Sequence, residues 1–367
     1  MQAVLGWALA RRFAAAPLPG PPQTPPPITV LKPLHGAEPL LEEALASLCR
    51  QDYPDFQIVC GVQDPADPAL AVVARLQARF PERDIAVVVD PTPHGANRKV
   101  GNLINMLPAA RHDVLVIADS DVHAGAGYLS GISATLARPG TGLACVLYVG
   151  LPAGRGLAAL LGAGWINHIF LPGALLARAL GRQDCLGASM ALRRETLAAI
   201  GGLAALAEHL ADDNRLGRLV RARGLDVALA APVVATTVGE TGLAALWRHE
   251  LRWARTIRAL EPVGFAASIL QFKLVWAALA LAAAPGVTTA GLVAAIWAAG
   301  ALAARGTERA LAPRAPEGLA FFAPVWLLPL REALSVAILI ASYLGNRVDW
   351  RGHALSAAPP AQGTRTP

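Results

Sequence analysis

Acidic side chains follow two apolar runs of the chain at the points where those runs end. Asp64 lies two residues after the run 56–62, and Asp119 and Asp121 form an Asp-Ser-Asp motif directly after the run 114–118. If both runs are strands of one parallel sheet, their carboxyl ends meet at the edge where such sheets bind ligands. Paired carboxylates there suit a hard divalent cation that takes its other ligands from phosphate and water. Asp64 can instead accept hydrogen bonds from a base or a ribose, and turn formation is the alternative explanation of both motifs.

Two adjacent carboxylates, Asp212 and Asp213, stand near the expected start of a helix in the segment ADDNRLGRLV. Helix N-termini favour carboxylates, so capping explains one of the two. The second is a candidate general base, a group that must reach the proton it removes. Lys99 lies at the start of another expected helix. It can counter the charge of a diphosphate there, and an ordinary solvated helix start explains it equally well.

A third group of residues lies on the segment 242–258, GLAALWRHELRWARTIR. Helical spacing puts His249, Arg252 and Trp253 on one face of this segment. A guanidinium beside an indole can bind a diphosphate while the ring stacks on a sugar or an apolar acceptor. A helix lying on a membrane surface, with its arginines at the lipid headgroups, explains the same pattern. Both explanations can hold, because an apolar segment follows directly.

The segments that must position these residues alternate between apolar runs and helical patterns. Helices are predicted between successive apolar runs, at 38–50, 68–79 and 97–107. Continuous apolar strands separated by helices indicate an α/β fold with a mostly parallel sheet covered on both faces. The predicted strands are 28–34, 56–62, 85–89, 114–118 and 142–149.

The composition of the chain indicates a membrane region. The 367 residues are 54% hydrophobic and 16% charged, and the mean hydropathy is +0.43. Soluble domains carry about 25% charged residues, so a purely soluble protein is excluded. Apolar stretches at 265–284, 287–304 and 321–344 predict two or three membrane helices. Arg331 and Glu332 interrupt the third stretch, so two half-helices, or an interfacial helix with a short span, are alternatives there.

Four parts are therefore expected along the chain. A short apolar N-terminus and proline-rich linker (1–27) precede a cytosolic sheet domain (28–262), a membrane region (263–345) and a polar tail (346–367). Arginines after the second apolar stretch place the sheet domain in the cytosol by the positive-inside rule. The cysteines show no CxxC pairing and are interpreted as small core residues in a reducing compartment.

The charge of the chain limits its partners. The net charge is +6 and the pI is about 9.5, values that suit a phosphate-bearing substrate or an anionic lipid surface. No run of lysine and arginine with interleaved aromatic residues is present, so we do not expect nucleic acid as a partner.

Taken together and in order, these motifs resemble the D, D, D, (Q/R)xxRW signature of ceramide glucosyltransferase-like enzymes. These are inverting glycosyltransferases with a GT-A domain, and the resemblance runs over about residues 28–258, with membrane segments matching the C-terminal part. One departure is His249, which stands where the signature has Gln or Arg. The residues that carry the resemblance are Asp64, Asp119, Asp121, Asp213, His249, Arg252 and Trp253.

The resemblance implies a role for each of these residues. Asp64, Asp119 and Arg252 would bind the nucleotide sugar, a UDP-sugar, and Lys99 joins them by its position beside the acidic motif. Asp119 and Asp121 would hold Mg²⁺ or Mn²⁺, and Asp213 would be the catalytic base. Trp253 and His249 would contact the acceptor, a membrane lipid.

Within the family, the segments LKPLHGAEP, IADSD, HELRW and NRVDWRGH are most similar to a bacterial branch associated with hopanoid biosynthesis. That branch implies a multi-pass protein of the bacterial inner membrane that transfers N-acetylglucosamine from UDP-GlcNAc to bacteriohopanetetrol. A bacterial ceramide glucosyltransferase, using UDP-glucose, would carry nearly the same site. A non-catalytic nucleotide-binding membrane scaffold is the alternative from another class of protein.

Overall fold

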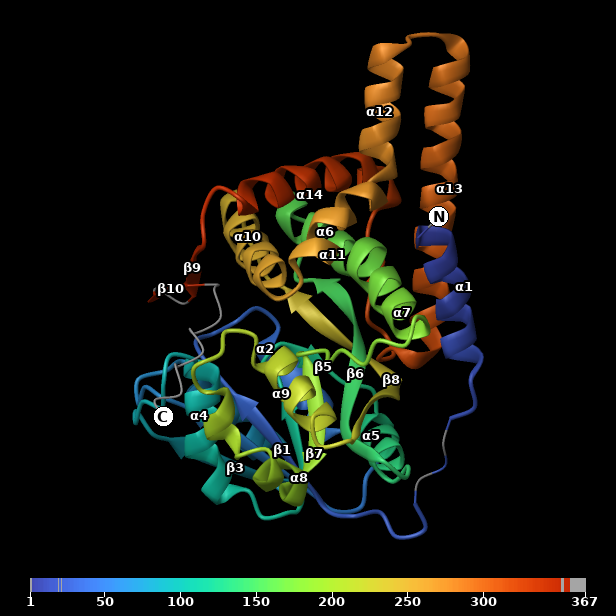
Figure 1. Cartoon of the computed structure of the whole chain (residues 1–367). Helices are drawn as coiled ribbons and strands as arrows, with labels where there is room; N and C mark the ends of the chain where they lie inside the picture. The colour runs from blue at the N-terminus through green and yellow to red at the C-terminus, as the bar shows by residue number, and fades with distance from the viewer. Residues whose placement is uncertain (1, 19, 21, 351–352, 357–367) are drawn as a thin grey trace, which may run out of the picture.

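The computed structural model of the chain describes residues 2–18, 20, 22–350 and 353–356. In these residues one sheet contains eight strands in the order β3-β2-β1-β4-β7-β6-β8-β5 (Figure 1). Its strands are β1 (Ile28–Pro33), β2 (Phe56–Val62), β3 (Asp84–Val89), β4 (Val114–Ala118), β5 (Val122–His123), β6 (Thr141–Pro152), β7 (Ser189–Arg193) and β8 (Asp226–Val238).

The sheet is mostly parallel, as expected, with two antiparallel strands that make it mixed. Strands β3, β2, β1 and β4 pair in parallel, as the sequence predicts. Strand β7 then runs antiparallel between β4 and β6, and β5 pairs antiparallel with β8. Both β7 and β8 were absent from the sequence prediction. Their neighbours in the sheet come from distant parts of the chain, and β8 contains Pro232, which weakens a strand pattern.

Helices cover both faces of this sheet. Over the first half of the chain they match the predicted segments closely, and Asn97 caps α4 by accepting a hydrogen bond from the N–H of Val100. The helices of the sheet domain are α2 (Leu41–Cys49), α3 (Ala69–Arg79), α4 (Arg98–Met106), α5 (Tyr128–Leu136), α6 (Leu157–Trp165), α7 (Leu171–Ala179), α8 (Arg194–Ala199), α9 (Asp212–Arg221) and α10 (Leu243–Leu260).

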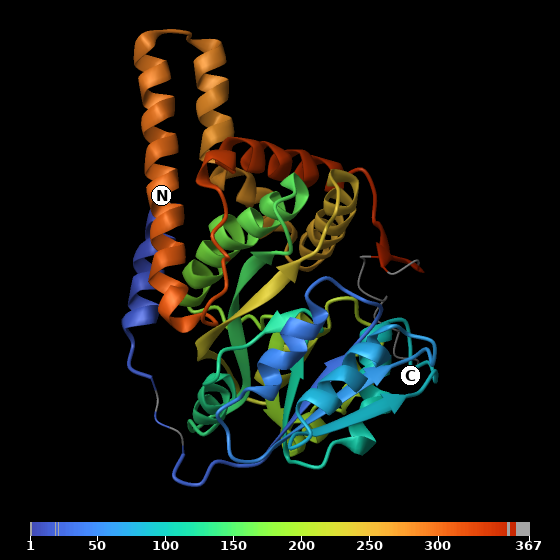
Figure 2. The same cartoon turned by 180° about the vertical axis from the view of Figure 1, so that it is seen from behind.

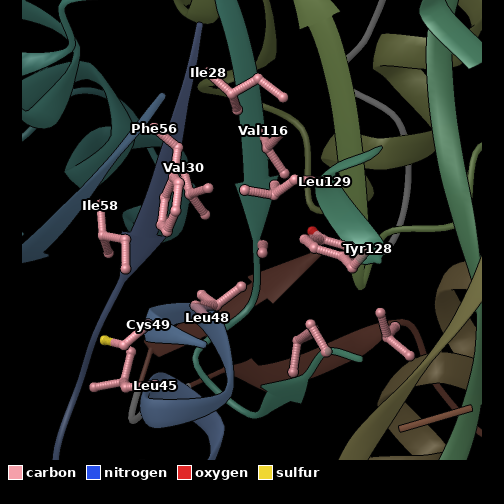
Figure 3. Packing of buried hydrophobic residues seen from close by; sticks show 14 of the residues in the cluster. Ile28, Val30, Leu45, Leu48, Cys49, Phe56, Ile58, Val116, Tyr128 and Leu129 are labelled. Atoms are coloured by element: carbon pink, nitrogen blue, oxygen red, sulfur yellow. The ribbon is translucent and has the colours of Figure 1, made fainter. Parts of the chain in front are cut away.

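Alternate residues of the strands pack on opposite faces of the sheet. On one face, Ile28, Val30 and Phe56 belong to one buried cluster with Leu48 and Cys49 of α2 (Figure 3). Residues of opposite parity, such as Leu31 and Val59, pack under α4 on the other face. This burial on both faces confirms the predicted layer arrangement. All four cysteines are buried free thiols, Cys49, Cys60, Cys145 and Cys185.

The C-terminal part forms a helical hairpin and a set of helices at its base. Helices α12 and α13 stand side by side and rise from the body, while α14 runs across the base of the hairpin (Figures 1 and 2). Helix α1 packs along α13, where Trp7 lies against Gly306. The elements are α1 (Gln2–Ala15), α11 (Pro262–Ala267), the 3-10 turn η4 (Ser268–Gln271), α12 (Lys273–Ala283), α13 (Val287–Leu311), the 3-10 turn η6 (Val325–Leu327), α14 (Leu328–Ser342), β9 (Arg347–Trp350) and β10 (His353–Ser356).

The membrane prediction needs two corrections. The stretch 265–284 is not one straight helix, because Pro262–Gln271 and Lys273–Ala283 meet at an angle of 57°. The charges of Arg331 and Glu332 do not interrupt the third stretch, since α14 continues through both. By length and composition, three described helices are able to cross a membrane, and four are if the bent pair counts as one span. One of them, Leu157–Ala179, was not singled out in the sequence and is 61% buried.

Candidate active site

A cavity of about 860 Å³ lies between the carboxyl ends of the strands and the helices above them. One end of the cavity is polar and one end is apolar. We call the polar part the donor end; it is lined by Lys99, Asp119, Asp121, Asp212 and Asp213. We call the other part the acceptor end. It is lined by Ile257 of α10, Phe265 of α11, Phe272 just before α12, and Ile338 and Leu339 of α14.

Lys99 connects the two acidic motifs at the donor end. It opens α4, and its Nζ lies 2.6 Å from Oδ1 of Asp119 and 3.5 Å from Oδ2 of Asp212. Burial acts to lower the pKa of Lys99, but the two carboxylates outweigh burial and raise it. Lys99 therefore stays charged and holds the end of β4 beside the start of α9.

Asp121 is the more confined carboxylate of the Asp-Ser-Asp motif. Its Oδ2 accepts a hydrogen bond from Thr236 of β8 at 2.5 Å. Burial, and then the neighbouring charge of Asp119, raise its pKa to about 6. Both carboxylates are partly buried, and a cation would relieve the repulsion between them.

A buried lysine beneath this motif was not among the predicted site residues. Lys32 is fully buried in β1, and its Nζ donates a hydrogen bond to the backbone carbonyl of Asp119. Burial lowers its pKa to about 8. A lysine inside an otherwise apolar strand was the available signal, because lysine is rarely buried without a partner.

Asp213 faces the cavity from the first turn of α9. Burial, and then the charge of Asp212, raise its pKa to about 6. Gly187 allows the approach of this side chain, since a Cβ at that position would lie 2.7 Å from Oδ2 of Asp213. Asp212, by contrast, faces Lys99 and accepts a hydrogen bond from Asn97 at 3.4 Å. The pair thus divides into one ion-paired carboxylate and one that is available for proton transfer.

His249 and Trp253 lie together on the cavity face of α10, as helical spacing predicts. The rings are 4.3 Å apart in an edge-on arrangement, and Trp253 lies 5.1 Å from Trp165. Nδ1 of His249 donates a hydrogen bond to Glu240, which the sequence analysis did not identify. Burial acts to raise the pKa of Glu240, but this hydrogen bond and the charges of His249 and Arg252 lower it below its usual value.

A π-helix at Ile166–Phe170 joins α6 to α7 and turns its side chains in two directions. Trp165 and Phe170 line the cavity. On the opposite side, His168 lies 2.9 Å from Glu308 of α13. An insertion of this kind in a helix often marks a functional site, because it changes the direction of single side chains. Here it connects the cavity wall to the helical hairpin.

Asp64 is the predicted site residue that the structure does not bring to the cavity. It is exposed after β2, and its carboxylate accepts a hydrogen bond from the N–H of Ala66 at 2.8 Å. The residue before it, Gln63, lines the cavity. Asp64 thus has the geometry of a turn residue, and its contact with a nucleotide stays a prediction.

The donor end fits a divalent cation that binds together with a diphosphate. The described residues contain no group of three or more His, Cys, Asp or Glu side chains placed to hold a metal ion. Among the residues that line the cavity, Asp119 and Asp121 are the two carboxylates of the Asp-Ser-Asp motif. Magnesium is commonly held by one or two carboxylates plus substrate phosphates and water, so this donor set suits it.

The fold and the site together define a class of protein. The mixed α/β sheet with its C-terminal helices has a GT-A-like fold, the fold of glycosyltransferases. The architecture is similar to that of the mannosyltransferase PcManGT from Pyrobaculum calidifontis in complex with GDP-Man and Mn²⁺. The TM-score is 0.54 at 22% sequence identity, and the match covers 93% of this chain and 94% of that one.

The chain belongs to glycosyltransferase family 21, whose sequence model matches residues 2–362. It is 36% identical over 117 residues to a ceramide glucosyltransferase of Komagataella phaffii, covering 31% of this chain and 23% of that protein. It is 23% identical over 243 residues to ceramide glucosyltransferase 1 of Caenorhabditis elegans, covering 66% of this chain and 52% of that protein. This chain thus spans about half or less of the length of each of these relatives. The resemblance to ceramide glucosyltransferases and the GT-A fold are confirmed.

Proposed function

We propose that this protein transfers a sugar from a UDP-sugar to a hydroxyl group of a membrane lipid, with inversion at the anomeric carbon. One observation carries the proposal. A single cavity joins a carboxylate-lined donor end to an apolar acceptor end, and the acceptor end is walled by helices next to the apolar hairpin. A nucleotide sugar needs the first environment and a lipid needs the second.

The donor end would bind the diphosphate of the UDP-sugar. Asp119 and Asp121 would hold a divalent cation, which when bound neutralises the negative charge that grows on the leaving diphosphate. Lys99 adds a fixed positive charge beside Asp119. Arg252 lines the same cavity and presents a guanidinium group for phosphate oxygens.

Asp213 would remove the proton from the acceptor hydroxyl. The hydroxyl oxygen forms a bond to the anomeric carbon as the bond from that carbon to the UDP oxygen breaks, and UDP leaves. With a pKa of about 6, Asp213 is largely charged at neutral pH and is also basic enough to accept a proton. Attack from the face opposite to UDP gives inversion.

Ceramide is the first acceptor to test, because the curated relatives are named ceramide glucosyltransferases. Bacteriohopanetetrol with UDP-GlcNAc is the second, and it rests on the sequence segments that resemble the hopanoid-associated branch. Both lipids combine an apolar body with a hydroxyl-bearing end. Trp253 and Trp165 would pack against the acceptor near the reacting hydroxyl.

The helical hairpin would anchor the protein in a membrane, with the sheet domain on the cytosolic side. Arginines near the end of α13 support this orientation by the positive-inside rule. They are Arg305, Arg309 and Arg314. A location in the bacterial inner membrane remains a prediction from the resemblance.

The test is mass spectrometry of lipids after membranes containing the protein are incubated with UDP-glucose or UDP-GlcNAc. The acceptors are ceramide, bacteriohopanetetrol and diacylglycerol, each tested separately. We expect a mass increase of one hexose on ceramide or one N-acetylhexosamine on the hopanoid. Membranes with the Asp213→Asn variant should give no product, while Asp55→Asn, at an exposed aspartate, serves as the matched control. UDP binding without transfer to any lipid would favour the non-catalytic scaffold instead.

A further inference from the structure

The outer face of α14 and its flanking residues is apolar. Six exposed residues recur at alternating intervals of four and three, which places them on one stripe. Trp326 is 64% exposed and Leu344 is 83% exposed. Every residue of this segment is described, and its exposed residues are all apolar apart from the hydroxyl of Tyr343. The stripe is Trp326, Leu330, Ala333, Ala337, Ile340 and Leu344.

The inner face of α14 carries the polar groups. Arg331 donates to both carboxylate oxygens of Glu250 on α10, each at 2.7 Å. Glu332 lies 2.7 Å from Nζ of Lys273, at the start of α12. A helix on a water-exposed protein surface has the opposite arrangement, with apolar residues inward and charged residues outward. The outward face of α14 therefore suits a lipid environment.

Helix α14 packs against α10 at several points along its length. Leu327 packs against Leu246 near the first ends of the two helices, and Arg331 pairs with Glu250 one turn later. At the far end, Arg258 of α10 donates a hydrogen bond to the carbonyl of Gly345 at 3.1 Å. If α14 spanned the bilayer, α10, which packs against it, would therefore have to span the bilayer as well.

Helix α10 is not able to cross a bilayer. It carries six ionisable side chains within eleven residues, and each charge at the centre of a bilayer is costly. The six are Arg248, His249, Glu250, Arg252, Arg255 and Arg258. The hairpin of α12 and α13 rises away from α14, which crosses its base in both views of the molecule (Figures 1 and 2).

We propose that α14 lies in the plane of the membrane surface, with the stripe from Trp326 to Leu344 in contact with lipid, and does not span the bilayer. This placement leaves α12 and α13 as the crossing elements of the C-terminal region. It also keeps Gly345 and Asn346, which follow the stripe, on the side of the sheet domain. The proposal concerns the position of a helix and does not depend on the reaction proposed above.

The placement gives α14 a function as a wall between lipid and cavity. Ile338 and Leu339 of its inner face line the acceptor end of the cavity. Val263 and Leu270, on the neighbouring α11 and η4, are also strongly exposed and extend the apolar surface. A lipid lying in the surface layer of the membrane would thus be next to the acceptor end.

The test measures the depth of three positions along the stripe. Leu330→Cys, Ala337→Cys and Leu344→Cys are labelled with an environment-sensitive fluorophore in the full chain. The native cysteines are buried, so they compete little for the label. The proteins are placed in vesicles of phosphatidylethanolamine and phosphatidylglycerol, whose acyl chains carry bromine at a shallow or a deep position. Leu292→Cys on α13 is the deep control, and Glu82→Cys on the sheet domain is the control outside the membrane.

We expect the shallow bromine to quench all three positions to the same extent, and more strongly than the deep bromine. A spanning helix would instead place Leu330 and Leu344 about 21 Å apart in depth, and quenching would change along the stripe. Such a gradient of quenching along the stripe would overturn the proposal. Quenching as weak as that of the control Glu82→Cys would also overturn it.

Discussion

The two ends of the cavity are built in different ways. At the donor end, the carboxylates stand at the end of a buried strand and the start of a helix, so local backbone geometry fixes their positions. At the acceptor end, the walls come from α10, α11 and α14, which meet only through tertiary packing. In the proposed reaction, short motifs would set the chemistry of transfer, and the packing of the apolar helices would set the choice of acceptor. Each end can be changed while the other remains intact.

A large effect at the donor end is expected for Asp121→Asn. The change removes a carboxylate that would hold the cation, and it leaves the hydrogen bond from Thr236 possible. Electrostatic groups that act on the leaving group contribute about 10²–10³ in rate, so we expect a loss of that size. Chelation of divalent cations should abolish transfer by the unchanged protein and add little to the defect of the variant. Full activity of Asp121→Asn in the presence of a chelator would exclude it as a metal ligand.

At the acceptor end, Arg331→Met should destabilise the protein. Glu250 would be left as a buried charge without its partner, at a cost of about 3–5 kcal/mol in the free energy of unfolding. Thermal unfolding in detergent measures this cost. The double variant Arg331→Met with Glu250→Gln removes both charges and should recover most of the loss. Equal stability of the single and double variants would contradict the importance of this ion pair.

The dependence of the rate on pH should reveal Asp213. A general base works only when it is deprotonated, and a pKa raised to about 6 means that Asp213 gains its proton at a higher pH than an ordinary aspartate. The value of kcat/KM should therefore be constant above neutral pH and fall as the pH drops through about 6. A rate that stays constant down to about pH 4, the usual pKa of aspartate, would contradict this assignment.

A smaller effect is expected for the pair of Glu240 and His249. Glu240 accepts the Nδ1–H of His249 and so fixes the orientation of the ring, which leaves Nε2 for the cavity. Glu240→Ala should reduce kcat/KM by about tenfold, the equivalent of 1.4 kcal/mol in the activation free energy. In a His249→Gln background, which restores the residue of the signature, the same change should have little effect. An equal loss in both backgrounds would show that Glu240 only supports the fold.

The sequence predicted the donor end well because its signals are local. The strands 56–62 and 114–118 were predicted with the observed bounds, and Asp119, Asp121 and Asp213 do line one cavity. Asp64 was assigned from its place after a strand, but the direction of the turn that follows keeps it exposed. A strand end predicts where a residue lies, and it does not predict where the side chain points.

The acceptor end was less predictable because its contacts join distant segments. The sequence predicts an interruption at Arg331 and Glu332, because it does not show that Glu250 and Lys273 neutralise them. Glu240 has no motif of its own and is recognised only beside His249. The antiparallel strand β7 depends in the same way on partners from β4 and β6.

The central claim is that one cavity holds both a donor site and the base that activates the acceptor. It is tested most directly by comparing Asp213→Asn with the unchanged protein in two measurements, UDP binding by calorimetry and sugar transfer to lipid by mass spectrometry. Loss of a general base lowers the rate by about 10²–10⁴, so we predict near-complete loss of transfer with UDP affinity unchanged. Transfer that persists in Asp213→Asn, or loss of UDP binding together with transfer, would contradict the account.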